Sequence, residues 1–120
     1  MPRNMSFSLT TEQIRLRQKD VTRRIGWWFL KPNDIVNAVE KSMGLRKGDR
    51  INHLCKIRIL STRKEPLNAI TDDDVAREGF VDWDRQSFMA LFCEHNRCSI
   101  HDPVNRIEFE YLLEACSDDR

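Results

Sequence analysis

Two polar residues near the start of the chain could act as a nucleophile and its base. Lys19 stands three positions before Thr22, and Arg24 follows two positions later. In a strand Thr22 and Arg24 point to the same face, and Lys19 joins them if the chain bends where a helix meets the strand. An amine that is partly buried among guanidinium groups has a lowered pKa and can deprotonate a hydroxyl. The spacing therefore predicts that the three side chains meet over one pocket.

The same stretch also has the composition of a nucleic-acid-binding surface. Cations neutralise phosphates, and aromatic rings stack on bases with roughly 1–3 kcal/mol for each stacked base. A solvated basic face beside a tryptophan of the core is the alternative, and composition does not separate the two. The residues expected to bind such a ligand are Arg17, Lys19, Thr22, Arg23, Arg24, Trp27 and Trp28.

Residues 18–24, QKDVTRR, resemble the Lys-x-x-Thr-x-Arg signature of ASCH domains, a branch of the PUA-like superfamily. Residues 30–34, LKPND, resemble the Lys-Pro-Gly-Asp turn that precedes a strand in this family. Segments 77–80, 84–95 and 106–109 follow in the family's order, so the resemblance covers most of residues 7–113. It is strongest to the small, stand-alone ASCH proteins of bacteria and bacteriophages.

The resemblance implies a β-barrel with a cleft beside the Lys-x-x-Thr element. RNA, a nucleotide or nucleoside, or single-stranded nucleic acid is the expected partner, and no cofactor is expected. One small bacterial branch is an amidohydrolase that removes the acetyl group from acetylated cytidine. Carried over by position, Lys19 is the base, Thr22 the nucleophile and Glu78 the group that assists proton transfer. Asp20 is expected to raise the pKa of the neighbouring Lys19 amine and to weaken it as a base.

The chain of 120 residues has a formal net charge of only +1, but its two halves differ. Residues 1–64 hold 15 Lys and Arg against 5 Asp and Glu, whereas residues 65–120 hold 5 against 14. This asymmetry favours an anionic partner for the basic half. Two halves that face and neutralise each other are the alternative. A protein partner bound by the acidic half is a further hypothesis without a motif to support it.

Length and composition predict a single domain over residues 1–120, and the resemblance places its core at about residues 7–113. The 40% hydrophobic share argues against disorder. No apolar run is long enough to span a membrane, and the N-terminus lacks a signal-peptide pattern, so a cytoplasmic protein without disulfides is expected.

A zinc site is the alternative use of Cys93, His95, Cys98 and His101, but their spacing is irregular and no metal is expected.

The elements that must position these residues follow from periodicity and punctuation. Helices are expected from Thr10 or Thr11 to about Gln18, over 72–78 and over 84–95. Strands are expected over 21–28, 35–39, 54–60 and 104–112, with a turn at 31–34, a loop at 44–49 and an irregular start at 1–6. This order predicts an α+β domain, a small and mostly antiparallel β-barrel with flanking helices.

Overall fold

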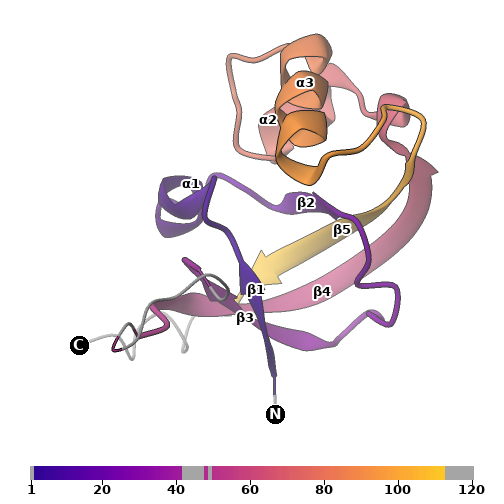
Figure 1. Cartoon of the computed structure of the whole chain (residues 1–120). Helices are drawn as coiled ribbons and strands as arrows, with labels where there is room; N and C mark the ends of the chain where they lie inside the picture. The colour runs from indigo at the N-terminus through magenta and orange to yellow at the C-terminus, as the bar shows by residue number, and fades with distance from the viewer. Residues whose placement is uncertain (1, 42–47, 49, 113–120) are drawn as a thin grey trace.

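One curled sheet organises the molecule. The computed structural model describes residues 2–41, 48 and 50–112, and within them five strands pair in the order β1-β3-β4-β5-β2. The strands are β1 (Arg3–Ser6), β2 (Val21–Arg24), β3 (Ile35–Val39), β4 (His53–Pro66) and β5 (Pro103–Tyr111). The β1–β3 pair is parallel and the other three pairs are antiparallel. The sheet bends into a half-barrel (Figure 1), which confirms the predicted α+β class and its mostly antiparallel barrel architecture.

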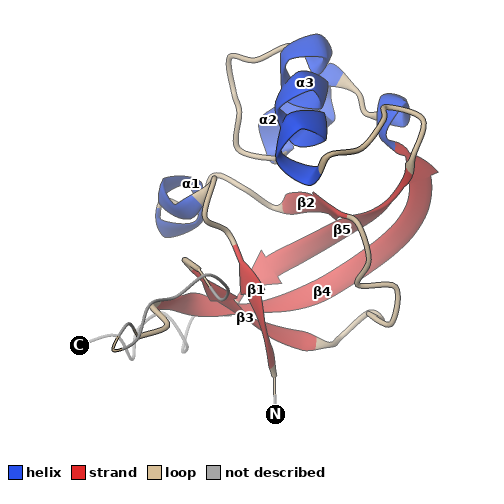
Figure 2. Ribbon diagram, viewed as in Figure 1, coloured by secondary structure: helices blue, strands red, loops and turns tan. Residues whose placement is uncertain are grey.

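The helices lie beside this sheet (Figure 2). α1 (Thr11–Arg15) precedes β2, while a 3-10 turn (Leu67–Ala69), α2 (Asp72–Arg77) and α3 (Arg85–Asn96) connect β4 to β5. The side chains of Thr71 and Asp84 accept hydrogen bonds from the backbone N–H groups of Asp74 and Ser87, so each caps its helix. The predicted starts of both later helices are therefore confirmed.

Several predicted boundaries are wrong for local reasons. The strand expected over 21–28 ends at Arg24, because Gly26 and Trp27 both have positive φ angles and turn the chain. The strand expected over 54–60 runs from His53 to Pro66, with a register shift between Ile59 and Ser61 that lets it bend without ending. The first helix ends at Arg15 and not near residue 18.

The N-terminal residues, expected to be irregular, form β1. This short strand shows no alternation of apolar residues, and its parallel partner β3 lies more than thirty residues away, so local patterns do not reveal it. Met5 is fully buried and anchors it. Most of the loop expected at 44–49 falls outside the described residues.

Two hydrophobic clusters hold the elements together. The larger one fills the curl of the sheet with Met5, Phe7, Ile14, Leu30, Val36, Ala38, Ile57, Ile59, Ile107 and Phe109. The smaller one lies beneath α3 and contains Leu67, Ile70, Val75, Phe88, Met89, Phe92 and Val104. α2 and α3 pack on this smaller cluster, and the larger cluster does not hold them in place. A further interaction is therefore needed to fix their position relative to β2.

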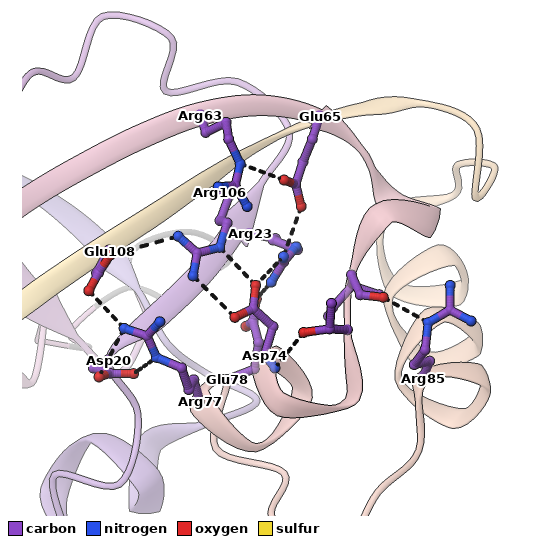
Figure 3. A network of polar contacts seen from close by, with 12 residues as sticks. Asp20, Arg23, Arg63, Glu65, Asp74, Arg77, Glu78, Arg85, Arg106 and Glu108 are labelled. Atoms are coloured by element: carbon purple, nitrogen blue, oxygen red, sulfur yellow. Dashed lines mark hydrogen bonds and ion pairs between the residues drawn. The ribbon is translucent and has the colours of Figure 1, made fainter.

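A buried network of ion pairs supplies that interaction (Figure 3). The side chain of Arg23, on β2, is fully buried and donates to Asp74 at 2.6 Å and to Glu65 at 2.8 Å. Asp74, on α2, also accepts two hydrogen bonds from the guanidinium of Arg106 on β5, at 2.7 and 3.1 Å. These contacts join α2 to β2, β4 and β5. Cations of the basic half thus face carboxylates of the acidic half, as the neutralisation alternative proposed.

We expect Asp74→Asn to lower the free energy of unfolding by roughly 3–5 kcal/mol, because it leaves two buried guanidinium groups with a neutral partner. Urea denaturation at pH 7 measures the loss. Asp73→Asn is the matched control, since Asp73 is exposed in the same helical turn and should cost less than about 1 kcal/mol.

The pH dependence provides a second check of the same prediction. Its guanidinium partners hold the pKa of Asp74 far below its usual range. The stabilisation is therefore complete above the unfolded-state pKa, about 3.9, and is lost as the pH falls through the lower folded-state pKa. The difference between the wild type and Asp74→Asn should shrink only below about pH 4; a constant difference down to pH 2 would contradict it.

Candidate functional site

Lys19 lies in the connection between α1 and β2 and is 3% exposed. Its Nζ donates to the Oε1 of Glu78 at 2.7 Å and to the backbone carbonyl of Glu78 at 2.8 Å. Its own carbonyl accepts a hydrogen bond from the Tyr111 hydroxyl, which fixes the backbone. Burial lowers the pKa of Lys19, while the Glu78 carboxylate acts in the opposite direction and favours the charged amine. Lys19 is therefore a buried amine whose charge depends on one carboxylate.

Glu78 caps the C-terminal end of α2, at the point where this end lies against α1, and there it reaches Lys19. Gly79 follows with a φ of +102°, and the backbone turns there at the end of the helix. A Cβ at this position would lie 2.7 Å from Cγ of Gln13, so only glycine lets α1 approach so closely. Gln13 also donates to the carbonyl of Gly79 at 3.3 Å. The second oxygen of Glu78 accepts from Arg23 at 3.2 Å, which couples the site to the buried network.

Thr22 and Arg24 project from one face of β2, as the spacing predicts. The hydroxyl oxygen of Thr22 accepts a hydrogen bond from Nε of Arg24 at 3.2 Å. The guanidinium of Arg24 lies 4.6 Å from the centroid of the Phe7 ring. Burial lowers the pKa of Arg24 to about 10. Among the described residues no carboxylate lies within ion-pair distance of Arg24, so it is a cation available to a ligand.

These side chains surround a cavity of about 120 Å³ between β2 and α3. Its polar wall consists of Lys19, Thr22, Arg24 and Glu78, with Arg23 behind them. The opposite wall is apolar and is formed by Phe80, Phe88, Leu91 and Phe92. Residues 6–10 form a third side, and His95 and Asn96 lie at the end of α3. A flat polar molecule could hydrogen-bond to one wall and contact aromatic rings on the other.

The structure does not bring all the predicted ligand-binding residues to this cavity. Arg17 is exposed, and its guanidinium lies 5.4 Å from the centroid of the Tyr111 ring. Trp27 packs partly against the main core, and Trp28 is half-exposed with the Lys64 amine 5.7 Å from its ring centroid. Neither tryptophan lines the cavity. They turn away because the chain reverses direction at Gly26 and Trp27.

Asp20 does not act on Lys19 as expected. Its carboxylate accepts two hydrogen bonds from the guanidinium of Arg77, at 3.1 and 3.3 Å, and Arg77 also pairs with Glu108. Sequence proximity was misleading here, because Lys19 turns inward to Glu78 while Asp20 remains near the surface.

Sequence reasoning missed the part of the aromatic wall that α3 supplies. Phe88, Leu91 and Phe92 form the apolar stripe predicted for the helix over 84–95, and such a stripe is typical of core packing. Part of it covers the core and part of it lines the cavity, a division that local periodicity does not reveal. Residues 6–8 and Leu9 carried no signal at all.

The zinc alternative finds no support in the part of the chain that the structure describes. Within it, no three His, Cys, Asp or Glu side chains come together as metal ligands. The sulfur atoms of Cys93 and Cys98 lie 3.9 Å apart, and His101 contacts Asn68 instead. Among these residues there is also no helix with the length and apolarity needed to cross a bilayer.

Solved structures with the same fold were found, although the sequence matches no family model and no curated protein. A protein from Enterococcus faecalis described by the family model DUF984 aligns with a TM-score of 0.66 and 14% identity, over 93% of this chain and 80% of its own. The hypothetical protein PH0355 aligns with a TM-score of 0.65 and 16% identity, over 93% of this chain and 100% of its own.

An ASCH domain from Lactobacillus crispatus aligns with a TM-score of 0.58 and 15% identity, over 91% of this chain and 78% of its own. At sequence identities of 14–16% the similarity shows the fold alone. It confirms that the chain has the ASCH-like fold expected from residues 18–24.

We expect Glu78→Gln to lower the pKa of the Lys19 amine further, because it removes the carboxylate that, among the described residues, opposes the effect of burial. An NMR titration of the Lys19 side chain, labelled with ¹³C at Cε, measures this pKa. Asp20→Asn is the control and should leave the pKa unchanged, since Asp20 pairs with Arg77. An equal shift in both variants would contradict the assignment of Glu78 as the partner of Lys19.

Proposed function

We propose that the protein with this ASCH-like fold binds a nucleobase-sized ligand in the cavity between β2 and α3. The ligand would be a nucleoside, a nucleotide or an unpaired base of RNA or single-stranded DNA. The observation that carries the proposal is the pairing of a donor-rich wall with an aromatic wall across one small cavity. A volume of about 120 Å³ is below the roughly 300–1,000 Å³ of sites for drug-sized ligands, so we expect it to hold a single ring of a ligand.

The polar wall favours an acceptor-bearing edge. The Lys19 ammonium has three donors and uses two of them on Glu78, and the guanidinium of Arg24 uses only Nε, on Thr22. The remaining donors suit a carbonyl, ring-nitrogen or phosphate oxygen acceptor, while Phe88 and Phe92 contact the apolar face of a ring.

Isothermal titration calorimetry with cytidine and cytidine monophosphate tests the proposal. Arg24→Met should weaken binding at least tenfold, because it removes the cavity cation that has no carboxylate partner among the residues the structure describes. Arg17→Met is the matched control and should bind like the wild type, since Arg17 lies outside the cavity. Unchanged affinity in Arg24→Met, with its fold verified by circular dichroism, would contradict binding in this cavity.

Amide hydrolysis of an acylated nucleoside is a second candidate, favoured by the presence of Lys19, Thr22 and Glu78 in the lining of one cavity. In this reaction the Thr22 hydroxyl attacks the acyl carbonyl while a neutral Lys19 accepts its proton. Collapse of the intermediate breaks the C–N bond, and the proton passes to the leaving amine. Water then cleaves the acyl ester on Thr22. Burial supports the neutral amine, and Arg24 can stabilise the charge that develops on the oxygens.

Incubation with N4-acetylcytidine tests this candidate, with the release of cytidine followed by liquid chromatography. Thr22→Val should abolish turnover, whereas Thr22→Ser, which keeps a hydroxyl, should retain measurable activity. If Thr22→Val releases cytidine at the wild-type rate, or if the wild type shows no turnover, binding remains the only candidate function.

A further inference from the structure

Two of the four cysteines lie together where α3 ends. Arg97 follows the helix in the left-handed conformation, with a φ of 54°, and turns the chain back toward it. The N–H of Cys98 then donates to the carbonyl of Cys93 at 3.2 Å. This hydrogen bond, from the second residue after the helix to its last turn, is typical of a Schellman motif, in which the side chains of the two bonded residues meet. Here both of those side chains are thiols.

The two thiols are in contact, and both are partly exposed. Sγ of Cys98 lies 3.9 Å from Sγ of Cys93 and donates a hydrogen bond to it. Each residue packs at the edge of the smaller hydrophobic cluster and keeps part of its surface accessible. The apolar contact of the motif needs no sulfur, because an aliphatic side chain at each position would also supply it. Two sulfur atoms add a reaction that aliphatic side chains lack, the formation of a covalent bond between them.

We propose that Cys93 and Cys98 form a reversible disulfide, which makes the end of α3 a redox modification site. An S–S bond is about 2.05 Å long, so the two sulfur atoms have to approach each other by roughly 2 Å. The motif already holds the backbones of the two residues together, and only the short segment 93–98 is closed into a ring. The approach therefore requires little movement in the rest of the fold. In reducing compartments such disulfides are transient and respond to the redox state.

The oxidant for this site is a small-molecule disulfide such as oxidised glutathione. Cys93 loses its proton, its thiolate attacks one sulfur of the glutathione disulfide, and one glutathione thiolate leaves. Cys98 then loses its proton and attacks Sγ of Cys93, which expels the second glutathione thiolate. The two protons pass to the two glutathione thiolates. The cysteines are thus oxidised by two electrons, and one glutathione disulfide is reduced to two thiols.

The contact between the two thiols indicates the order of these steps. Cys98 donates the S–H hydrogen bond and Cys93 accepts it. Burial and this hydrogen bond raise the pKa of the Cys98 thiol to about 11, so Cys98 keeps its proton at neutral pH. Cys93 is therefore the residue that attacks the oxidant, and Cys98 is the resolving residue. Once deprotonated, a thiol of high pKa is a strong nucleophile, and here its target sulfur is already adjacent.

The disulfide also constrains one side of the cavity. His95 and Asn96 line the cavity and lie within the segment 93–98 that the bond closes into a ring. Amide hydrogen exchange of residues 95–98, followed by NMR, should slow by about threefold or more in the oxidised protein, because local opening of the helix end becomes less favourable. The proposal does not rest on the proposed function, since the contact between the thiols is independent of what the cavity binds.

Tryptic peptide mapping after equilibration with mixtures of reduced and oxidised glutathione tests the site. Trypsin cleaves after Arg97, between the two cysteines. With the remaining thiols alkylated before digestion, the oxidised wild type should yield peptides 86–97 and 98–106 joined to each other, and reduction should separate them. Cys98→Ser is the matched control. It lacks the resolving thiol, so Cys93 should carry bound glutathione at about ten times the wild-type level or more.

Four results would contradict this inference. The first is the absence of joined peptides at every glutathione ratio, whether or not Cys93 carries glutathione. The second is joined peptides that come only from a covalent dimer on a non-reducing gel, which would place the bond between two copies of the chain. The third is a bond from either peptide to the one that contains Cys55 or Cys116, in place of the bond between Cys93 and Cys98. The fourth, equal hydrogen exchange in the reduced and oxidised proteins, would refute the constraint on the cavity. If Cys98→Ser unfolds, Cys98→Ala provides the same control.

Discussion

The burial of one guanidinium constrains the rest of the molecule. Arg23 lies in the middle of β2 with no exposed side-chain surface, and a buried charge is tolerated only when it is paired and hydrogen-bonded. Glu65, Asp74 and Glu78 supply the pairing, and they come from β4 and from α2 with its C-terminal end. The position of α2 against the sheet therefore follows from electrostatics as much as from apolar packing. Even so, the buried Nε of Arg23 has no partner among the described residues, which adds to the cost of this arrangement.

The candidate site takes its electrostatics from this constraint. Glu78 divides its two carboxylate oxygens between Arg23, in the network, and Lys19, at the cavity. Burial acts on the pKa of Lys19 in one direction and Glu78 acts in the other, so a change at Glu78 or at its partner Arg23 alters the proton affinity of the cavity amine. The aromatic wall is linked to the same constraint, because α3 packs with α2 in the smaller hydrophobic cluster. Stability and chemistry thus depend on the same carboxylate.

Much of this site could be predicted from local patterns. Thr22 and Arg24 share a face because strand side chains alternate, and Lys19 joins them because the chain bends before β2. Glu78 was predicted from its position in the resemblance to the ASCH family, and in the structure its carboxylate contacts Lys19. The tryptophans were assigned to the same cleft because they follow within four residues. Two positive φ angles reverse the chain there, however, and a bulky residue at such an angle has no reliable sequence signal. β1 escaped prediction because its pairing partner is distant in the sequence.

By itself the sequence determined the α+β class, most of the elements, and the motif that places a lysine, a threonine and an arginine together. These features depend on neighbours a few positions apart, where periodicity and capping act. Only the tertiary structure decided which opposite charges meet. Asp20 lies beside Lys19 in the chain but pairs with Arg77, while Lys19 pairs with Glu78, 59 positions away. Ion pairs depend on distance in space and on burial, so the nearly neutral total charge concealed a core in which the two halves neutralise each other.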